Sequence, residues 1–152
     1  MTDEQWMTRA IRVCREGMRE GQSPFGAVIV RGDSVLAESH NSTSRDHDPT
    51  AHAEINAIRT ACRLEETSRL AGTTLYSTCE PCPMCLAAIL WADVDRVVFG
   101  ASIADAAAAG FAQFPIAASH LADLAGRRLI LTQGVLPDVC VGLFDEWKSV
   151  RE

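Results

Sequence analysis

The sequence has 152 residues, of which 47% are hydrophobic and 22% charged, and it carries a net charge of −6. This length predicts a single domain, spanning residues 1–152, with a core large enough to be stable without disulfides. The acidic charge argues against a nucleic-acid partner, because phosphate binding depends on clustered Lys and Arg side chains.

The first part of the chain predicts a helix followed by a β-hairpin. Apolar residues recur with helical spacing over residues 3–20, which is typical of an amphipathic helix, and Gly21 is suited to end it. Short apolar runs at 25–30 and 34–39 are separated by a turn at 31–33, and they predict two paired strands.

The polar segment 40–49 predicts a loop, after which a second helix is expected. Asp48 is a typical N-cap residue and Pro49 a typical first helical residue, so the helix is predicted to begin there and to run to residue 64. A strand, a helix, a strand, a region of short helices and loops, a strand and a closing helix follow, over residues 73–77, 82–92, 96–100, 102–125, 128–132 and 138–150. This alternation predicts one mixed sheet with helices on both faces.

The cysteines and the N-terminus bear on the cellular location. Residues 1–20 contain no signal-peptide pattern, and no apolar run approaches the ~20 residues of a membrane span. We therefore expect a cytoplasmic protein without membrane contact, whose six cysteines are metal ligands or buried thiols rather than disulfides. Three of them fall in helical patterns and are interpreted as small core residues: Cys14, Cys62 and Cys140.

Two short segments carry the residues best suited to chemistry: His52-Ala53-Glu54 and Pro81-Cys82-Pro83-Met84-Cys85. A Cys-x-x-Cys pair at a turn entering a helix can place both sulfurs on one metal ion, and the helix N-terminus favours the thiolate form. One His added to two Cys leaves an open position on a tetrahedral Zn²⁺, which marks a catalytic rather than a structural site. The sequence therefore predicts one Zn²⁺ per chain, held by His52, Cys82 and Cys85.

Glu54 is the candidate catalytic residue, because a carboxylate beside the zinc can take a proton from water and deliver it to a leaving amine. Side chains two positions apart in an α-helix point about 200° away from each other. His52 and Glu54 can therefore flank one metal only near a helix start. The order H-x-E and then P-C-x-x-C is a known signature of zinc-dependent base deaminases. Two alternatives remain open: a redox role for the Cys-x-x-Cys pair, and competition from Cys79 for the metal.

These segments resemble the cytidine deaminase-like superfamily, and in particular its bacterial guanine deaminase and tRNA adenosine deaminase branches. The similarity also covers the residues around Phe25 and Asn41, the stretch from Asp48 to Ile55 and the helix that ends near Trp91. The resemblance implies an α/β fold, a three-layer α/β/α sandwich with a five-stranded mixed central sheet. It also implies a homodimer with each active site near the interface.

The resemblance further assigns substrate contacts. Asn41 matches a position that hydrogen-bonds the base, Phe25 and Trp91 match wall positions, and the Ala53 backbone N–H is a further contact. For Phe25 and Trp91 the alternative is core packing, and for Asn41 it is a local turn role. The segment leading to Phe111 is similar to one of the guanine deaminase branch, in which acidic residues follow the Phe; here Ala112 and Gln113 follow it.

The sequence therefore predicts a zinc-dependent aminohydrolase that deaminates a free nucleobase or a related aminated heterocycle, with release of ammonia. Guanine is the first candidate substrate and cytosine the second. One alternative is a tRNA adenosine deaminase, which the acidic charge and the lack of a basic C-terminal stretch oppose. A second alternative is a zinc-binding module without catalysis, in which Glu54 would have no purpose.

Overall fold

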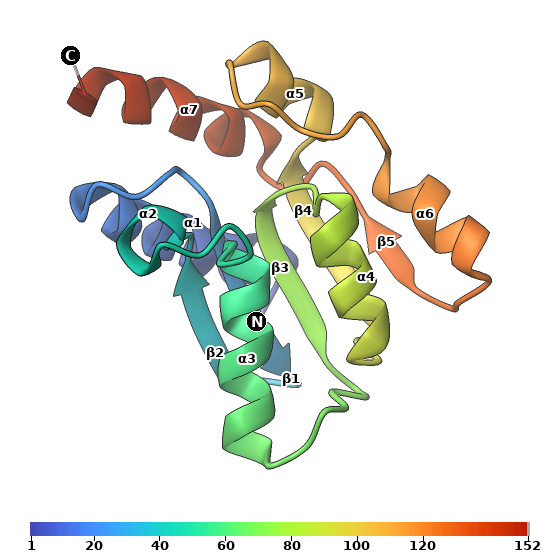
Figure 1. Cartoon of the computed structure of the whole chain (residues 1–152). Helices are drawn as coiled ribbons and strands as arrows, with labels where there is room; N and C mark the ends of the chain where they lie inside the picture. Colours follow the sequence, from blue (N-terminus) through green and yellow to red (C-terminus); the bar gives the residue numbers. More distant parts are fainter. Residues whose placement is uncertain (152) are drawn as a thin grey trace.

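The computed structural model describes residues 1–151, which form a mixed five-stranded sheet with helices on both faces (Figure 1). The strands are β1 (Gly26–Arg31), β2 (Ser34–His40), β3 (Thr74–Cys79), β4 (Arg96–Ala101) and β5 (Ile130–Thr132). The helices are α1 (Asp3–Arg19), α2 (Thr43–Asp46), α3 (Ala53–Glu65), α4 (Pro83–Trp91), α5 (Ile103–Ala108), α6 (Ala118–Ala125) and α7 (Pro137–Arg151).

The strand order is β2-β1-β3-β4-β5. β1 runs antiparallel to both β2 and β3, whereas β3, β4 and β5 run parallel to one another. The predicted mixed sheet of five strands is therefore confirmed. Because β3 and β4 are parallel, their carboxyl ends lie at the same edge of the sheet, the usual place for a ligand site in an open α/β fold.

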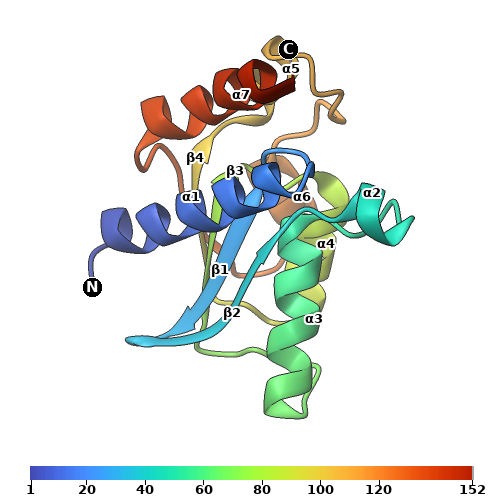
Figure 2. The same ribbon diagram turned by 90° about the vertical axis from the view of Figure 1, so that its left-hand side faces the viewer.

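Helices cover the two faces of the sheet, so that the molecule has three layers (Figure 2). α1 and α7 pack on one face, and α3, α4 and α6 contribute to the core on the other. Each face of the sheet has its own hydrophobic core, and successive residues of β1 point into one core and then the other. Val28 and Val30 lie in the core with α1, and Ala27 and Ile29 lie in the core with α3. This double burial explains why the strand is apolar along nearly its whole length.

The first helix, α1, is stabilised by side-chain caps at its N-terminus and by close packing of its buried face against β1. Thr2 and Gln5 form a capping box, in which each side chain accepts a hydrogen bond from the backbone N–H of the other. Gly26 lies directly beneath the helix, and a Cβ atom there would come within 2.4 Å of the Ala10 carbonyl oxygen. Glycine at this position therefore allows α1 to approach β1 closely.

The predicted start of α3 was wrong. The helix begins at Ala53 with His52 as its N-cap, not at Asp48 and Pro49. The Asp48 carboxylate instead accepts hydrogen bonds from the backbone N–H and the hydroxyl of Thr50, which stabilise a turn before the helix. The segment predicted as a loop over 40–49 also contains the short helix α2.

The predicted short helices in 102–125 are confirmed as α5 and α6. Within residues 1–151, no helix combines the length and apolar character needed to cross a membrane.

Candidate active site

The two chemical motifs lie at the N-termini of neighbouring helices. In Figure 1, α3 and α4 lie side by side on one face of the sheet and both begin near the end of β3. His52 is the N-cap of α3 and Cys82 the N-cap of α4, and both have extended backbone conformations. His52 therefore lies outside the helix proper, which removes the helical-spacing difficulty between it and Glu54.

Three metal-ligating side chains converge at this point. His52 Nδ1 lies 3.6 Å from Cys82 Sγ and 3.5 Å from Cys85 Sγ, and the three ligand atoms lie within 4.8 Å of one another. Ordinary Zn–N and Zn–S bond lengths at a tetrahedral angle give an N···S separation of about 3.6 Å. The residues therefore fit Zn²⁺ in both donor chemistry and spacing.

The local charges also suit a cation. A hydrogen bond from Cys85, aided by His52, lowers the pKa of the Cys82 thiol to about 4. The same bond to Cys82, together with burial, raises the pKa of Cys85, so without a cation the pair favours one negative charge. Hydrogen bonding to Cys82 raises the pKa of His52. A divalent cation replaces these shared protons and allows both sulfurs to be thiolates.

Glu54 lies beside this triad in the first turn of α3, with 5% of its surface exposed. Burial raises the pKa of its carboxyl group, against the opposing effects of hydrogen bonds and the nearby His52. The Ser77 hydroxyl on β3 lies 3.0 Å from Glu54 Oε1 and 2.6 Å from the Cys79 carbonyl oxygen. One hydroxyl proton thus has two acceptors, an arrangement that orients the carboxyl group and suits a residue that gains and loses a proton.

A cavity of about 520 Å³ opens onto Glu54, His52 and Cys82. Two of the residues expected to contact the substrate, Asn41 and Phe25, are among those that line it. The remaining lining residues are Ser23, Thr43, Pro49, Cys79, Glu80, Met84, Ala112, Gln113 and Phe114. The volume lies within the range of ordinary small-molecule sites.

The other three residues expected to contact the substrate are not among the lining residues. Phe111 packs behind the cavity wall, where its ring makes an edge contact with Phe25 at 5.4 Å between centroids. Ala53 is fully buried at the start of α3. Trp91 stands at the end of α4 with 79% of its surface exposed, and the structure does not bring it to the cavity. Cys79 reaches the cavity but is not part of the metal-ligating group found within residues 1–151.

Glu80 is a residue whose function the sequence analysis missed. Its two carboxylate oxygens accept hydrogen bonds from the backbone N–H of Ile103 (3.0 Å) and of Ala118 (2.8 Å), the first residues of α5 and α6. Ala117, the N-cap of α6, provides no side-chain cap, so Glu80 takes that role. In the sequence, only its position within the Cys79–Cys85 segment could have indicated a role for Glu80, because its hydrogen-bond partners lie far along the chain.

Comparison with known proteins decides the family. The sequence-family model named "Cytidine and deoxycytidylate deaminase zinc-binding region" matches residues 1–101 of this chain. These residues include all three metal ligands and Glu54. The chain belongs to this deaminase family. It is a zinc-dependent deaminase, and its Zn²⁺ is bound by the triad His52, Cys82 and Cys85.

The relatives of this zinc deaminase include a guanine deaminase and tRNA-specific adenosine deaminases. It is 46% identical over 112 residues to the guanine deaminase of Bacillus subtilis, covering 73% of this chain and 72% of the relative. It is 42% identical over 99 residues to the tRNA-specific adenosine deaminase of Bacillus subtilis, covering 65% of this chain and 62% of the relative. A crystal structure of the protein NE0047 in complex with 2,6-diaminopurine is similar with a TM-score of 0.91 and 27% identity, over 99% of this chain and 84% of that one.

Proposed function

We propose that this zinc deaminase hydrolyses the amino group of a free nucleobase, with guanine as the first substrate to be tested and cytosine as the second. The observation that carries the proposal is the cavity over Glu54, which is lined by neutral polar, apolar and aromatic side chains and by a second carboxylate that is already hydrogen-bonded. The guanine deaminase relative and the structural relative with a bound aminopurine support a purine base. We also propose that it works as a single cytoplasmic domain.

The reaction replaces an amino group by oxygen: water adds to the carbon bearing the amine, the C–N bond breaks and ammonia leaves. When bound, Zn²⁺ lowers the pKa of water and so supplies a nucleophile near neutral pH. The Glu54 carboxylate takes one proton from the water and delivers it to the departing nitrogen. Its burial excludes bulk solvent from this transfer, and Ser77 keeps Oε1 in place.

Phe25 and Asn41 are proposed to hold the base over Glu54. The Phe25 ring lies between the cavity and a cluster formed by Phe111 and Phe144, at 5.4 Å and 6.0 Å between centroids. This packing makes the ring a rigid apolar wall. Asn41 contributes a polar contact beside Phe25, to whose carbonyl oxygen its backbone N–H donates. Trp91 and Phe111 do not line the cavity and would act on the base only indirectly.

Deamination of adenosine in tRNA is the second candidate, and the similarity to the tRNA-specific enzyme favours it. Two features oppose it. The net charge is −6, and the described residues that line the cavity include no Lys or Arg. An RNA substrate would be expected to meet cationic side chains at the mouth of the site.

We further propose a homodimer formed through α4. Apart from the metal ligand Cys85, every side chain of this helix, Pro83–Trp91, is apolar, and a helix that is apolar on all sides is normally buried on all sides. Yet Trp91 is 79% exposed in the single chain, and a second subunit would cover it. In sedimentation equilibrium, Trp91→Glu should shift the protein toward a monomer, and a wild-type monomer at micromolar concentration would contradict the dimer.

Ammonia release from the zinc-loaded protein tests the proposed activity. The panel contains guanine, cytosine, adenine, their nucleosides and a tRNA anticodon stem-loop, with Glu54→Gln as the catalytically inactive control. Turnover of guanine that is lost in Glu54→Gln supports the proposal. If the stem-loop is deaminated and none of the free bases is, the enzyme is a tRNA adenosine deaminase and the proposal is overturned.

A further inference from the structure

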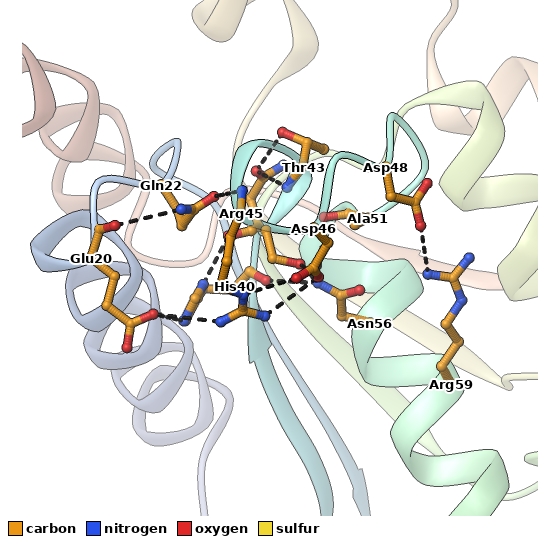
Figure 3. Close-up of polar contacts among 12 residues, drawn as sticks. Glu20, Gln22, His40, Thr43, Arg45, Asp46, Asp48, Ala51, Asn56 and Arg59 are labelled. Atoms are coloured by element: carbon orange, nitrogen blue, oxygen red, sulfur yellow. Dashed lines mark hydrogen bonds and ion pairs between the residues drawn. The ribbon is translucent and has the colours of Figure 1, made fainter.

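The segment between β2 and α3 builds one wall of the cavity. It contributes Asn41, Thr43 and Pro49 to the lining, while the start of α3 contributes His52 and Glu54. The relative position of these two chain segments therefore fixes where the base lies with respect to the reacting groups. Figure 3 shows a group of polar side chains that joins the segment to α1 and α3.

Asn41 is held in one orientation by its neighbours. Its Oδ1 accepts hydrogen bonds from the backbone N–H of Thr43 at 3.2 Å and from the Thr43 hydroxyl at 3.1 Å, and its own backbone N–H donates to the Phe25 carbonyl oxygen at 3.1 Å. Because Thr43 N–H can only donate, the carboxamide oxygen must face Thr43. The Nδ2 group is then the end of Asn41 that is left for a ligand in the cavity.

Asn56 bonds to the chain on both sides of Asn41. Its Nδ2 donates to the His40 carbonyl oxygen at 3.0 Å and to Ser42 Oγ at 2.9 Å, with a longer contact of 3.4 Å to the Ala51 carbonyl oxygen (Figure 3). Both main donors of one carboxamide are thus used to hold the residues immediately before and after Asn41. No other side chain described in residues 1–151 bonds to both of these neighbours.

The same residue is tied to the catalytic end of α3. The backbone N–H of Asn56 donates to the carbonyl oxygen of His52 at 2.9 Å, as part of the first turn of the helix. Asn56 therefore connects Asn41 to the metal ligand through one rigid turn of helix. It does not line the cavity over Glu54, so it can act on a base only through other residues, and Asn41 is the one whose two neighbours it holds.

The other side of Asn41 is fixed from α1. His40 Nδ1 donates to the Asn41 carbonyl oxygen at 2.8 Å, and His40 Nε2 lies 3.3 Å from Glu20 (Figure 3). The imidazole rests on Gly17, where a Cβ atom would come within 2.5 Å of the ring. Glycine weakens a helix, so its presence in the last turn of α1 fits a packing role beneath this histidine.

We infer that Asn56 is a positioning residue for substrate binding: its carboxamide holds His40 and Ser42 so that Asn41 presents its Nδ2 group to an acceptor atom of the base. This inference rests on the proposed role of Asn41 in base binding. It implies that the substrate offers a ring nitrogen or a carbonyl oxygen at that point, since Nδ2 can only donate.

Asn56→Asp tests the inference, because it keeps the size of the side chain and replaces the two donors by an acceptor that faces the His40 carbonyl oxygen. We expect KM for the deaminated base to rise about tenfold, the effect of one lost hydrogen bond, with kcat and zinc content unchanged. Thr60→Asp, one turn further along α3 at an exposed position, controls for the added charge. Asn56→Ala gives the same test should the aspartate variant fold poorly.

A double-mutant cycle separates positioning from general damage. In an Asn41→Ala background, Asn56→Asp should have no further effect on KM, because the residue through which it acts is gone. An equal rise of KM in both backgrounds, or no rise in either, would overturn the inference.

A second readout does not depend on turnover. In the zinc-loaded protein, the NMR signals of the Asn41 side-chain amide should shift and broaden in Asn56→Asp and stay unchanged in Thr60→Asp. Unchanged signals in Asn56→Asp would contradict the positioning role. If no base is deaminated, the proposed function fails, while these signals still decide the role of Asn56.

Discussion

The two walls of the cavity are held in different ways. The wall formed by residues 41–51 is hydrogen-bonded to Phe25, to His40 of β2 and to Asn56 of α3, and its key residue Asn41 is only 6% exposed. The second wall, residues 112–114, contributes Gln113 and a Phe114 that is 69% exposed. This wall lies between α5 and α6, whose first residues are both held by Glu80.

This difference suggests a hypothesis in which the first part of the chain carries the chemistry and the second wall selects the substrate. The metal ligands, Glu54 and the rigid wall belong to the first 101 residues, which are the part that the deaminase family model matches. The second wall, residues 112–114, lies beyond that region and between two helices, where loops commonly carry binding residues. We therefore expect variants near the metal to abolish the reaction, and variants in the second wall to change which base reacts.

The largest effect is expected from loss of a metal ligand. Cys85→Ala leaves a two-ligand site, so zinc content should fall from one per chain to near zero and deamination should disappear. Metal analysis after dialysis and an ammonia assay measure both quantities. Cys62→Ala, which removes a partly buried cysteine outside the metal group, is the matched control and should retain both. Full zinc occupancy in Cys85→Ala would refute the assignment of this ligand.

Glu80→Ala should loosen the second wall without touching the first. It leaves the N–H groups of Ile103 and Ala118 without their partner, which should lower the free energy of unfolding by about 1–2 kcal/mol. Hydrogen exchange at these two amides should accelerate, and KM should rise. Urea unfolding and exchange mass spectrometry measure these effects, with Glu16→Ala on the exposed face of α1 as control. Unaltered exchange at both amides would mean that other contacts hold the wall.

A smaller and more selective effect is expected from Gln113→Ala. The carboxamide lies at the second wall, so its removal should lower kcat/KM by about fivefold for the preferred base, while zinc content and stability stay unchanged. The ratio of kcat/KM for guanine and cytosine should change as well. Ser119→Ala, on the exposed side of α6, serves as control. An equal fall in kcat/KM for every base would show that Gln113 supports the reaction in general and does not select the substrate.

The smallest effect concerns an ion pair remote from both walls. Arg96 donates to both carboxylate oxygens of Asp3, at 2.9 Å and 2.7 Å, and Tyr76 donates to one of them at 2.7 Å. The Arg96 guanidinium lowers the pKa of Asp3 in the folded protein. The contribution to stability is therefore present above the unfolded pKa of about 3.9 and is lost as pH falls through the lower folded value.

Asp3→Asn should accordingly lower the free energy of unfolding by about 1 kcal/mol at pH 7, because the pair is partly exposed. The difference from the wild type should shrink as the pH is lowered below about 4. Urea denaturation at a series of pH values measures it. A difference that does not depend on pH would assign the effect to packing instead of charge.

Local signals in the sequence predicted most of the fold and the metal centre. Helical and strand periodicities located the principal elements, and the spacing of His52, Cys82 and Cys85 predicted a triad that the structure brings together. Asp48 misled the prediction of the α3 start because its side chain has two competing uses, a helix cap and a turn with Thr50, and only the fold selects between them.

Long-range contacts could not be predicted. Glu80 meets partners 23 and 38 residues away, and Asn56 meets His40 from a separate element, so neither leaves a local pattern. Trp91 matched a wall position by resemblance, but in the folded chain it is exposed at the end of α4, and the proposed dimer would be needed to cover it. Such relations depend on tertiary structure and assembly, not on spacing along the chain.

Catalysis by Glu54 at the zinc site is the central claim, and one measurement tests it most directly. The kcat for ammonia release should be compared between the zinc-loaded wild type and Glu54→Gln, with the zinc content of each measured on the same samples. We predict equal zinc content and a fall in kcat of roughly a thousandfold, since general acid–base catalysis contributes 10²–10⁴. Comparable kcat values at equal zinc content would contradict the account.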